Sequence, residues 1–560
     1  MKTKLCAALL ATISLSACAT TPADAPAEPV TVQILAINDF HGNLETPQRV
    51  YSFEQDGEVR QVQLGGAAQL AATLAGLRQV NSITVAAGDL VGASPLISAL
   101  FLDEPSIRAL SGMGLDVASV GNHEFDRGTQ ELLRMQNGGC EQFTLREPCG
   151  VEPFAGAGFE YLAGNVVDDE GGTLFPGTAM REVDGARIGF IGLTLEGTPV
   201  LVSAQATAGY EFLDEAETAN ALAAGLRAQG ADAVVLLIHE GAEVAGEYVL
   251  AGCPDLSGSI VPIVERLDPS ISVVVSGHTH QAYVCSVPNA AGGETLLTSG
   301  GRYGGFVTDI TMKVDPERDA VVSVSGTNTP VDGSAGSDTA IASLVAVYAE
   351  ASGPVANRAV GTIKDTGEHG EDCSDDPSED LTADAYLAAA NAALPEPVDF
   401  AIVNSGGVRT DLSGANDGVL TYGELAAMAP FGNGVIVLEM TGAQIRTVLE
   451  QQFCNESPAS ICDSLLTPSH GVQYTFDRNR PANQRVQELL INREPLDSAR
   501  TYRVVTNSFL AGGGDGFAQF SQVPEIANVG FDIDALEAYV AAGELTVPVC
   551  GRVRDLTPLS

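Results

Sequence analysis

Basic residues are scarce in this chain: 28 Lys and Arg stand against 72 Asp and Glu, and the formal net charge at pH 7 is −44. A field of that sign repels nucleic-acid backbones and anionic membrane surfaces, so the composition disfavours a nucleic-acid scaffold. A small anionic ligand would need local cations to overcome this field, and bound metal ions can supply them. The acidity is equally typical of an exported protein that stays soluble.

No Cys-x-x-Cys pair occurs in the sequence, which argues against a zinc site built from thiolates. Ten cysteines are present, of which Cys6 and Cys18 belong to the N-terminal segment. The other cysteines form an even set, which suggests disulfides in an oxidising compartment. Spacing does not decide the connectivity. Two pairs each flank a short polar loop and could form local bridges, Cys140–Cys149 and Cys454–Cys462. The remaining cysteines would then pair as Cys253–Cys285 and Cys373–Cys550.

The N-terminal segment is apolar from Leu5 to Ala17, which is too short to span a bilayer, and it follows two lysines. It ends in the tetrapeptide LSAC, which resembles the bacterial lipobox. That resemblance implies a signal peptide at 1–17, a lipid on Cys18 and a tether at 18–30. Because Ala19 rather than Asp follows, we expect a lipoprotein of the bacterial cell envelope, in the outer membrane facing the periplasm or the outside. An ordinary secretory signal cut nearby is the alternative.

A chain of 560 residues is expected to hold two to four domains, at roughly 100–200 residues each. Its first half alternates short, apolar, β-branched segments with helical stretches such as 66–80. This pattern predicts an α/β layer structure whose strands are buried on both faces. The predicted strands are 32–37, 82–87, 117–120, 161–165, 187–193, 233–238 and 271–276, followed by antiparallel strands at 295–299, 306–314 and 320–327.

A Gly-, Ser- and Asp-rich stretch then separates the two halves of the chain. Helical periodicity over 338–351 predicts a connecting helix, which Gly353 and Pro354 should end. We therefore predict a first domain at 31–330, a linker with a connecting helix at 331–357, and a second domain at 358–560. In the second domain we expect strands at 400–404, 434–440, 472–476 and 502–507, and helices at 381–394 and 442–453.

Polar side chains follow five of the predicted strands, where sites form in open α/β sheets. These residues are Asp39, His41, Asp89, Asn122, His123, His239, His278 and His280. Histidine and carboxylate ligands without a thiolate suit Zn²⁺, Mn²⁺, Fe²⁺ or Co²⁺. They are more than one ion needs, and one Asp could bridge two ions about 3.5–4 Å apart.

The segments NDFHGN, AAGDLVGASPL, GNHEFDRG, IHEG and SGHTH resemble the motif series of the calcineurin-like metallophosphoesterases. Their order, together with the second domain, resembles the 5′-nucleotidase family over nearly all of the mature chain. The resemblance implies an N-terminal four-layer α/β sandwich, joined by a helical linker to an α+β or α/β substrate-binding C-terminal domain. It also implies a ligand set, in which one ion is held by Asp39, His41 and His280, Asp89 bridges, and the other ion is held by Asn122, His239 and His278.

The same resemblance gives His123 a catalytic rather than a ligand role, in which it stabilises the transition state or protonates the leaving group. Asp126 would form a dyad with it and favour the imidazolium form through its negative charge. Asp126 also fits a helix N-cap, and both roles can hold.

The second domain carries the segments NSGGVR, PFGN and NSF followed by GGGDGF. By resemblance, Asn404 and Arg409 contact substrate, Phe431 and Phe509 sandwich a planar base, and Asp515 accepts hydrogen bonds from the base or ribose. The phenylalanines could instead be core residues, and Arg409 could sit in a structural ion pair. Members of the family carry further Arg residues before the first helix of this domain, but residues 367–376 contain none. His369 within this stretch, or Arg302 or Arg358 from other parts of the chain, could substitute for them.

These observations predict an enzyme that hydrolyses nucleotides as a 5′-nucleotidase, and UDP-sugars as well, by attack of a hydroxide held between two divalent ions. Zinc, manganese or cobalt would serve. Domain motion about the linking helix would bring bound substrate to the metals. Three alternatives remain open: a 2′,3′-cyclic-nucleotide phosphodiesterase with 3′-nucleotidase activity, a sulfur-ester (thiosulfonate) hydrolase, and a non-catalytic nucleotide-binding or adhesive surface lipoprotein. The sequence does not predict an oligomeric state.

Overall fold

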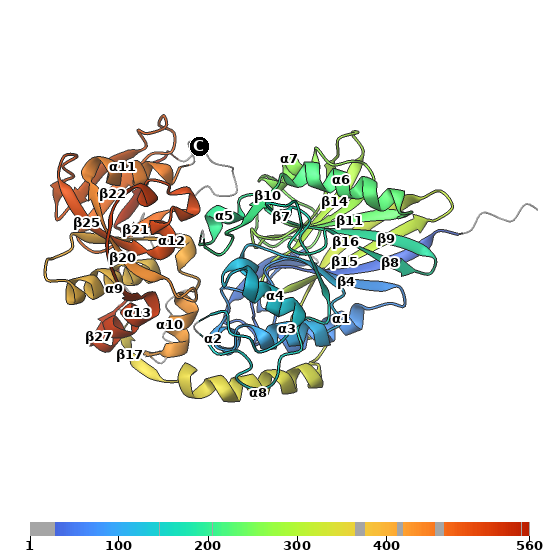
Figure 1. The fold of residues 1–560 in the computed structure, drawn as a ribbon, viewed down its shortest axis with the longest axis horizontal. Helices are drawn as coiled ribbons and strands as arrows, with labels where there is room; N and C mark the ends of the chain where they lie inside the picture. The colour runs from blue at the N-terminus through green and yellow to red at the C-terminus, as the bar shows by residue number, and fades with distance from the viewer. Residues whose placement is uncertain are drawn as a thin grey trace, which may run out of the picture.

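The computed structural model describes residues 28–55, 57–144, 146–203, 205–364, 374, 376–410, 418–453, 464–549 and 551–558. Two domains lie side by side, and a long helix runs along one edge to join them (Figure 1). The predictions for the signal segment, most of the tether, Cys18, His369, Cys373, Cys454, Cys462 and Cys550 lie outside the described residues. The predicted disulfides Cys140–Cys149 and Cys253–Cys285 are both present.

The first domain contains two mixed six-stranded sheets, in each of which four neighbouring strands pair in parallel and two further strands are joined by antiparallel pairing. The first sheet has the order β16 (Ala320–Pro330), β15 (Phe306–Asp315), β1 (Val30–Ile37), β4 (Ser82–Ala87), β5 (Val117–Ser119), β6 (Glu160–Leu162). The second has the order β13 (Ala282–Pro288), β14 (Glu294–Gly300), β12 (Ile271–Val275), β11 (Ala233–His239), β9 (Ala186–Thr194), β8 (Thr178–Val183).

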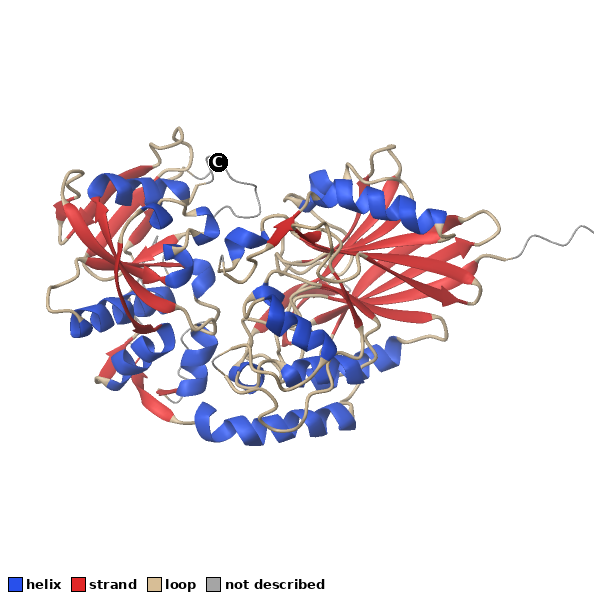
Figure 2. Ribbon diagram, viewed as in Figure 1, coloured by secondary structure: helices blue, strands red, loops and turns tan. Residues whose placement is uncertain are grey.

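The strands bury both faces because their apolar residues are nearly continuous. Ile34 of β1 belongs to the core between the two sheets, and its neighbour Leu35 packs on the helices outside. Helices α1 (Ala67–Leu77), α2 (Leu96–Ala99), α3 (Glu104–Gly112) and α4 (Thr129–Asn137) cover the first sheet. Helices α6 (Glu215–Ala228) and α7 (Ile260–Val264) cover the second. The predicted four-layer sandwich is therefore confirmed (Figure 2).

Several elements of this domain were not predicted. The hairpin β2 (Val50–Gln55) with β3 (Glu58–Gln63) looks polar in sequence, but Tyr51 and Phe53 pack on Phe306 and Tyr248. Strand β14 is parallel to β12 and antiparallel only to the unpredicted β13, and β6 is shorter than predicted. A small sheet of β7 (Val166–Asp168) and β10 (Tyr210–Phe212), and the short helix α5 (Thr198–Leu201), complete the domain.

The connecting helix α8 (Thr339–Ala356) continues past Gly353 and Pro354, so the predicted end was wrong. Proline excludes its predecessor from helical conformation partly through that residue's Cβ, which Gly353 lacks. Of the helices in the described ranges, α8 alone has the length and hydropathy to cross a membrane. It nevertheless packs Ile341 and Tyr348 into the first domain's core and leads directly into the second domain.

The second domain is built on a five-stranded sheet with the order β21 (Leu466–Pro468), β18 (Phe400–Asn404), β25 (Thr501–Asn507), β20 (Gly434–Thr441), β26 (Glu525–Phe531). Helices α9 (Pro377–Ala393) and α13 (Asp532–Ala541) pack on one face. The other face meets α11 (Gly442–Gln451) and a sheet of β24 (Glu494–Pro495), β23 (Val486–Ile491), β22 (Val472–Phe476) and β28 (Val553–Asp555).

A three-stranded sheet lies next to the linker, with the order β19 (Val419–Thr421), β17 (Ala359–Lys364), β27 (Glu544–Thr546). Helix α10 (Tyr422–Met428) follows β19, and α12 (Ser508–Ala511) follows β25. Both lead into loops that face the first domain, so the central sheet presents its loops to the neighbouring domain (Figure 1).

Candidate functional site

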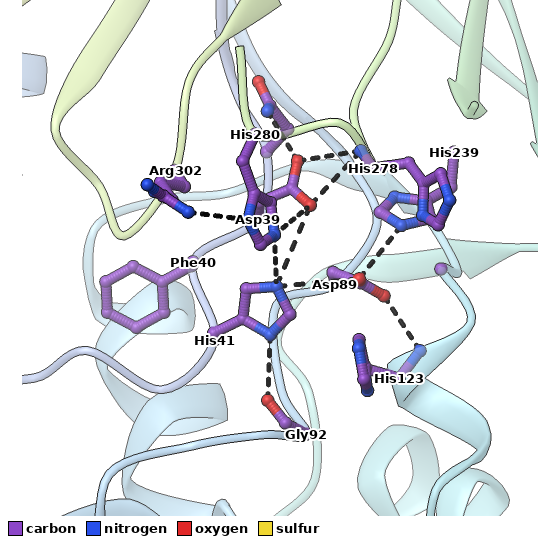
Figure 3. A network of polar contacts seen from close by, with 12 residues as sticks. Asp39, Phe40, His41, Asp89, Gly92, His123, His239, His278, His280 and Arg302 are labelled. Carbon is purple, nitrogen blue, oxygen red and sulfur yellow. Dashed lines mark hydrogen bonds and ion pairs between the residues drawn. The ribbon is translucent and has the colours of Figure 1, made fainter. Parts of the chain in front are cut away.

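The predicted metal ligands converge at the carboxyl ends of five parallel strands. Strands β1, β4 and β5 are neighbours in the first sheet, and β11 and β12 are neighbours in the second. Their ends place the polar residues in two groups, Asp39 with His41 and His280, and Asp89 with His239 and His278 (Figure 3). In each group the ligand atoms lie within 4.8 Å of one another.

Asp89 lies between the two groups. Its Oδ2 is 3.0 Å from His239 Nε2 and 3.6 Å from His41 Nε2. Asn122 joins the second group, since its Oδ1 lies 3.1 Å from His278 Nδ1. All seven predicted ligands are thus brought together, with Asp89 in the position that a bridging carboxylate needs.

The donor set fits divalent cations. The Nδ1–H groups of His41 and His239 donate to the carbonyls of Gly92 and Ala87, at 2.9 and 2.8 Å. Each imidazole therefore turns the lone pair of Nε2 into the cluster, as metal-binding histidines do. His239 Nε2 is buried and has no hydrogen-bond partner among the described residues, because its approach to Asp89 lacks hydrogen-bond geometry. A cation bound there would satisfy it.

The two buried carboxylates carry negative charge into this cluster. Burial raises the pKa of Asp39, but the neighbouring His280 and His41 outweigh burial and hold that pKa well below the ordinary value. Burial also raises the pKa of Asp89, but the charges of His239 and His123 outweigh burial and hold that pKa below the ordinary value. Both carboxyl groups are therefore ionised at neutral pH, which suits cation binding.

Five of the predicted ligands have positive φ, namely Asp39, His41, Asp89, His278 and His280. Non-glycine residues seldom adopt this left-handed conformation, although Asp and His tolerate it better than most. Such strain concentrates at functional sites and persists where the surroundings impose it. The sharp turns explain how strands from two sheets can aim their last residues at one small volume.

Two glycines allow the loops to approach each other. A Cβ on Gly121 would lie 2.1 Å from Asp89 Oδ1, and one on Gly88 would lie 2.7 Å from His239 Nδ1. Real Cβ atoms do not come closer than 3.0 Å to such neighbours. Any side chain at either position would displace a predicted ligand.

Two residues for which the sequence predicts no role, Glu124 and Asn38, hold these loops together. The buried carboxylate of Glu124 accepts hydrogen bonds from the backbone N–H groups of Asp89, Leu90 and Gly121, at 2.9, 2.8 and 2.6 Å. The amide of Asn38 donates to Asp39 Oδ2 and to the Gly301 carbonyl, each at 2.7 Å. Both residues lie inside motif segments, Glu124 in GNHE and Asn38 in NDFHGN, and this position was the only indication of their role that the sequence offered.

The predicted dyad is present. His123 Nδ1 lies 3.0 Å from Asp126 Oδ2, and the backbone N–H of His123 donates to Asp89 Oδ1 at 2.9 Å. Burial lowers the pKa of His123, but the charges of Asp126 and Asp89 outweigh it and raise the pKa above its ordinary value. The imidazolium form is therefore favoured, as a proton donor or a cation facing an oxyanion requires.

A cavity of about 500 Å³ lies between the domains and reaches the cluster. The first domain contributes His123, Asp126, His278, Asn122 and the apolar Leu201 and Val202. The second domain contributes all five predicted substrate contacts, which are Asn404, Arg409, Phe431, Phe509 and Asp515. The Phe431 ring stacks on His123 across the domain boundary, with centroids 5.7 Å apart and an interplanar angle of 18°.

The polar contacts on the second-domain side of the cavity differ between Asn404, which orients a neighbouring side chain, and Arg409, whose Nε has no hydrogen-bond partner among the described residues. Asn404 is 2% exposed, donates to Asp515 Oδ2 at 2.8 Å and accepts from Asn507 at 3.0 Å, so it orients Asp515. Burial raises the pKa of Asp515, which has a left-handed backbone with φ of 53°. Arg409 turns its guanidinium toward the Phe431 ring, 6.0 Å from the centroid, and its Nε has no hydrogen-bond partner among the described residues.

Arg302 and Arg358, two of the three candidates to replace the missing Arg residues, do not line this cavity, and the third, His369, lies outside the described residues. Arg358 lies at the linker, where it forms a bidentate ion pair with Glu537 at 2.7 and 2.9 Å. Arg302 lies beside His280, with its Nη1 3.2 Å from His280 Nδ1. Arg409 is thus the arginine that the described part of the cavity wall supplies.

The sequence matches the family profile described as Calcineurin-like phosphoesterase over residues 32–282, and that of the 5′-nucleotidase C-terminal domain over residues 354–522. Cell wall protein Lmo0130 of Listeria monocytogenes is 33% identical over 577 residues, which cover 95% of this chain and 70% of that protein. An NAD 5′-nucleotidase of Haemophilus influenzae is 25% identical, over 88% of this chain and 86% of its own length. A 5′-nucleotidase precursor from Thermus thermophilus shares the fold, with a TM-score of 0.75 and 24% identity over 95% of this chain and 100% of that one.

Proposed function

Because the chain belongs to the family of metal-dependent phosphoesterases that join a calcineurin-like domain to a 5′-nucleotidase C-terminal domain, we propose that it hydrolyses nucleoside 5′-monophosphates at a two-metal centre. The observation that carries the proposal is the cavity between the domains, whose two walls are the metal cluster with His123 and the set of Arg409, Phe431, Phe509 and Asp515. One wall offers cation ligands and a proton donor. The other offers a guanidinium and two aromatic rings, which suit a phosphate joined to a base.

Two divalent ions held by Asp39, His41, His280, Asp89, Asn122, His239 and His278 would activate water and neutralise the phosphoryl oxygens. His123, kept protonated by Asp126, faces the charge that develops as the ester bond breaks and gives a proton to the leaving oxygen. Arg409 binds phosphate oxygens or the ribose side of the substrate. Phe431 and Phe509 hold the base, and Asp515 accepts from hydroxyl or amino groups.

The size of the cavity also supports UDP-sugars as substrates. A volume of about 500 Å³ exceeds what a mononucleotide fills and lies within the range typical of small-molecule sites. We therefore include UDP-sugar hydrolysis in the proposal, with zinc, manganese or cobalt as the ion.

The test is phosphate release from 5′-AMP by the lipid-free protein, after chelation and after addition of Mn²⁺, Co²⁺ or Zn²⁺, with His123→Ala in parallel. Metal-dependent release that the variant loses supports the proposal, and UDP-glucose is then assayed in the same way. Cleavage of a generic phosphodiester without release from 5′-AMP would replace it with the cyclic-nucleotide reading. Inactivity on both would leave the sulfur-ester and non-catalytic readings.

We also propose that the chain is exported and anchored as a lipoprotein through Cys18. The lipobox-like tetrapeptide and the two disulfides support an extracytoplasmic location. Metabolic labelling with a palmitate analogue tests this: wild type should carry the label in the membrane fraction, and Cys18→Ala should carry none. Equal labelling of both would rule out lipid on Cys18.

A further inference from the structure

Arg302 gives one of the predicted metal ligands an unusual neighbour. Its Nη1 lies 3.2 Å from Nδ1 of His280 (Figure 3). Its Nη2 lies 3.2 Å from Glu247 Oε1. The side chain is 15% exposed, and Tyr303 lies beneath the guanidinium, 5.3 Å from the ring centroid. A cation is thus enclosed next to the metal cluster.

The donor pattern at His280 differs from that at His41 and His239. Those two histidines direct Nδ1–H to carbonyl oxygens, which frees Nε2 for an ion. His280 Nε2 also faces the cluster, 3.2 Å from His41 Nε2 and 3.4 Å from Asp39 Oδ1. If it binds an ion through Nε2, its Nδ1 must carry the hydrogen, and that N–H then points at guanidinium, which is only a donor.

The backbone holds Arg302 in this place. Its carbonyl accepts from Tyr51 O–H at 3.2 Å, and the N–H of the next residue, Tyr303, donates to the Asp39 carbonyl at 2.6 Å. The preceding Gly300 N–H donates to Asn38 at 2.7 Å. Hydrogen bonds therefore tie the loop of Arg302 to the loop of the ligand Asp39, and the guanidinium is held between His280 and Glu247.

We propose that Arg302 makes the Asp39–His41–His280 group the weaker of the two metal sites, so that the ion held there is the exchangeable one. The proposal rests on the proposed two-metal function. Its physical basis is the repulsion between the guanidinium and a divalent ion, added to the mismatch of two donors at His280 Nδ1. The group of Asp89, Asn122, His239 and His278 has no arginine among its described side-chain contacts, and the charge of His123 acts on Asp89, which both groups share.

The experiment is a Mn²⁺ titration of the chelator-stripped full chain, in which electron paramagnetic resonance measures free Mn²⁺. Wild type should show a tight and a weak class of site, and His280→Ala should remove the weak one. Arg302→Gln removes the charge and offers an acceptor, so the weak class should tighten at least tenfold, or about 1.4 kcal/mol. Arg302→Lys keeps the charge and should leave it weak.

Two further variants, at the exposed residues Arg49 and Glu247, provide a control and a second test. Arg49 pairs with the same Glu247 at 3.5 Å without touching His280, so Arg49→Gln should change neither class. Glu247 is 45% exposed and balances the charge of Arg302, so Glu247→Gln should weaken the weak class further. This second variant tests the idea in the opposite direction even if Arg302→Gln does not fold.

Three results would overturn the inference: two equal classes in wild type, a weak class that Arg302→Gln and Glu247→Gln leave unchanged, or loss of the tight class in His280→Ala. In each of these cases the two-metal function would survive. A wild-type protein that binds no Mn²⁺ and hydrolyses nothing would overturn both together.

Discussion

Gly121→Ala should displace Asp89, the carboxylate shared by both metal groups. The added Cβ would lie 2.1 Å from Asp89 Oδ1, 2.6 Å from Asp89 N and 2.8 Å from Asp89 Cγ. An ordinary contact needs 3.4 Å or more, so the loop must move by about 1 Å. The φ of Gly121 is not in the left-handed region, so the effect is one of space and not of backbone conformation.

The size of the effect follows from that displacement. Overpacking of this kind costs about 1–3 kcal/mol of stability, and misplacement of a reacting group by about 1 Å costs about 100-fold in rate. A loss of 100-fold in kcat/KM corresponds to about 2.7 kcal/mol of transition-state stabilisation. We expect a fall in the melting temperature of the first domain, a drop of about 100-fold in kcat/KM, and weaker binding of both ions.

The assay compares calorimetric unfolding of the metal-free protein, Mn²⁺ binding, and kcat/KM for 5′-AMP. Gly76→Ala is the matched control, because Gly76 lies in α1 with nothing near its added Cβ, and it should leave all three unchanged or raise stability slightly. Gly121→Ala with kcat/KM and Mn²⁺ affinity within threefold of wild type would refute the reasoning, since Asp89 would then not need its present position.

Three further variants test other parts of the site. Because the pKa of His123 is raised, kcat/KM should fall as the pH rises through that pKa, which lies above the ordinary value for histidine. Asp126→Asn should move this alkaline limb of the pH profile to lower pH. A limb that does not move would show that the His123–Asp126 pair has no part in catalysis. Phe431→Ala should raise KM for 5′-AMP by about tenfold with a smaller change in kcat, because base stacking contributes about 1–3 kcal/mol. An unchanged KM would mean that Phe431 packs on His123 without binding the base. Asn38→Ala removes three buried hydrogen bonds of 2.7 Å and should lower the free energy of unfolding, measured in denaturant, by about 2–4 kcal/mol. A decrease below about 0.5 kcal/mol would mean that the loops keep their conformation without Asn38.

The sequence was sufficient wherever side-chain character alone decides the structure. Strand β18 (Phe400–Asn404) and strand β22 (Val472–Phe476) have the predicted bounds, because short apolar runs next to turn residues leave few alternatives. The convergence of the candidate ligands was predictable because the parallel strands of each sheet end at one edge, and histidine and carboxylate residues follow those ends.

What the sequence did not show depends on contacts between distant segments. The hairpin containing Tyr51 and Phe53 is ordered by Phe306 and Tyr248, far along the chain. Asn404 lines the cavity as predicted, but its hydrogen bonds with Asp515 and Asn507 are contacts that no spacing rule reveals. Arg302 likewise has no motif, and only the loop after β14 brings it to His280.

The left-handed turns at Asp39, His41 and Asp89 have a consequence for how the protein acquires its ions. Glu124, Asn38 and the carbonyls of Gly92 and Ala87 hold these turns through hydrogen bonds of the chain itself. None of these hydrogen bonds needs an ion, so we expect the loops to keep their turns when metal is removed. Together with the proposed export, this predicts that the chain crosses the membrane without ions and that the metal supply of its final compartment selects the ion.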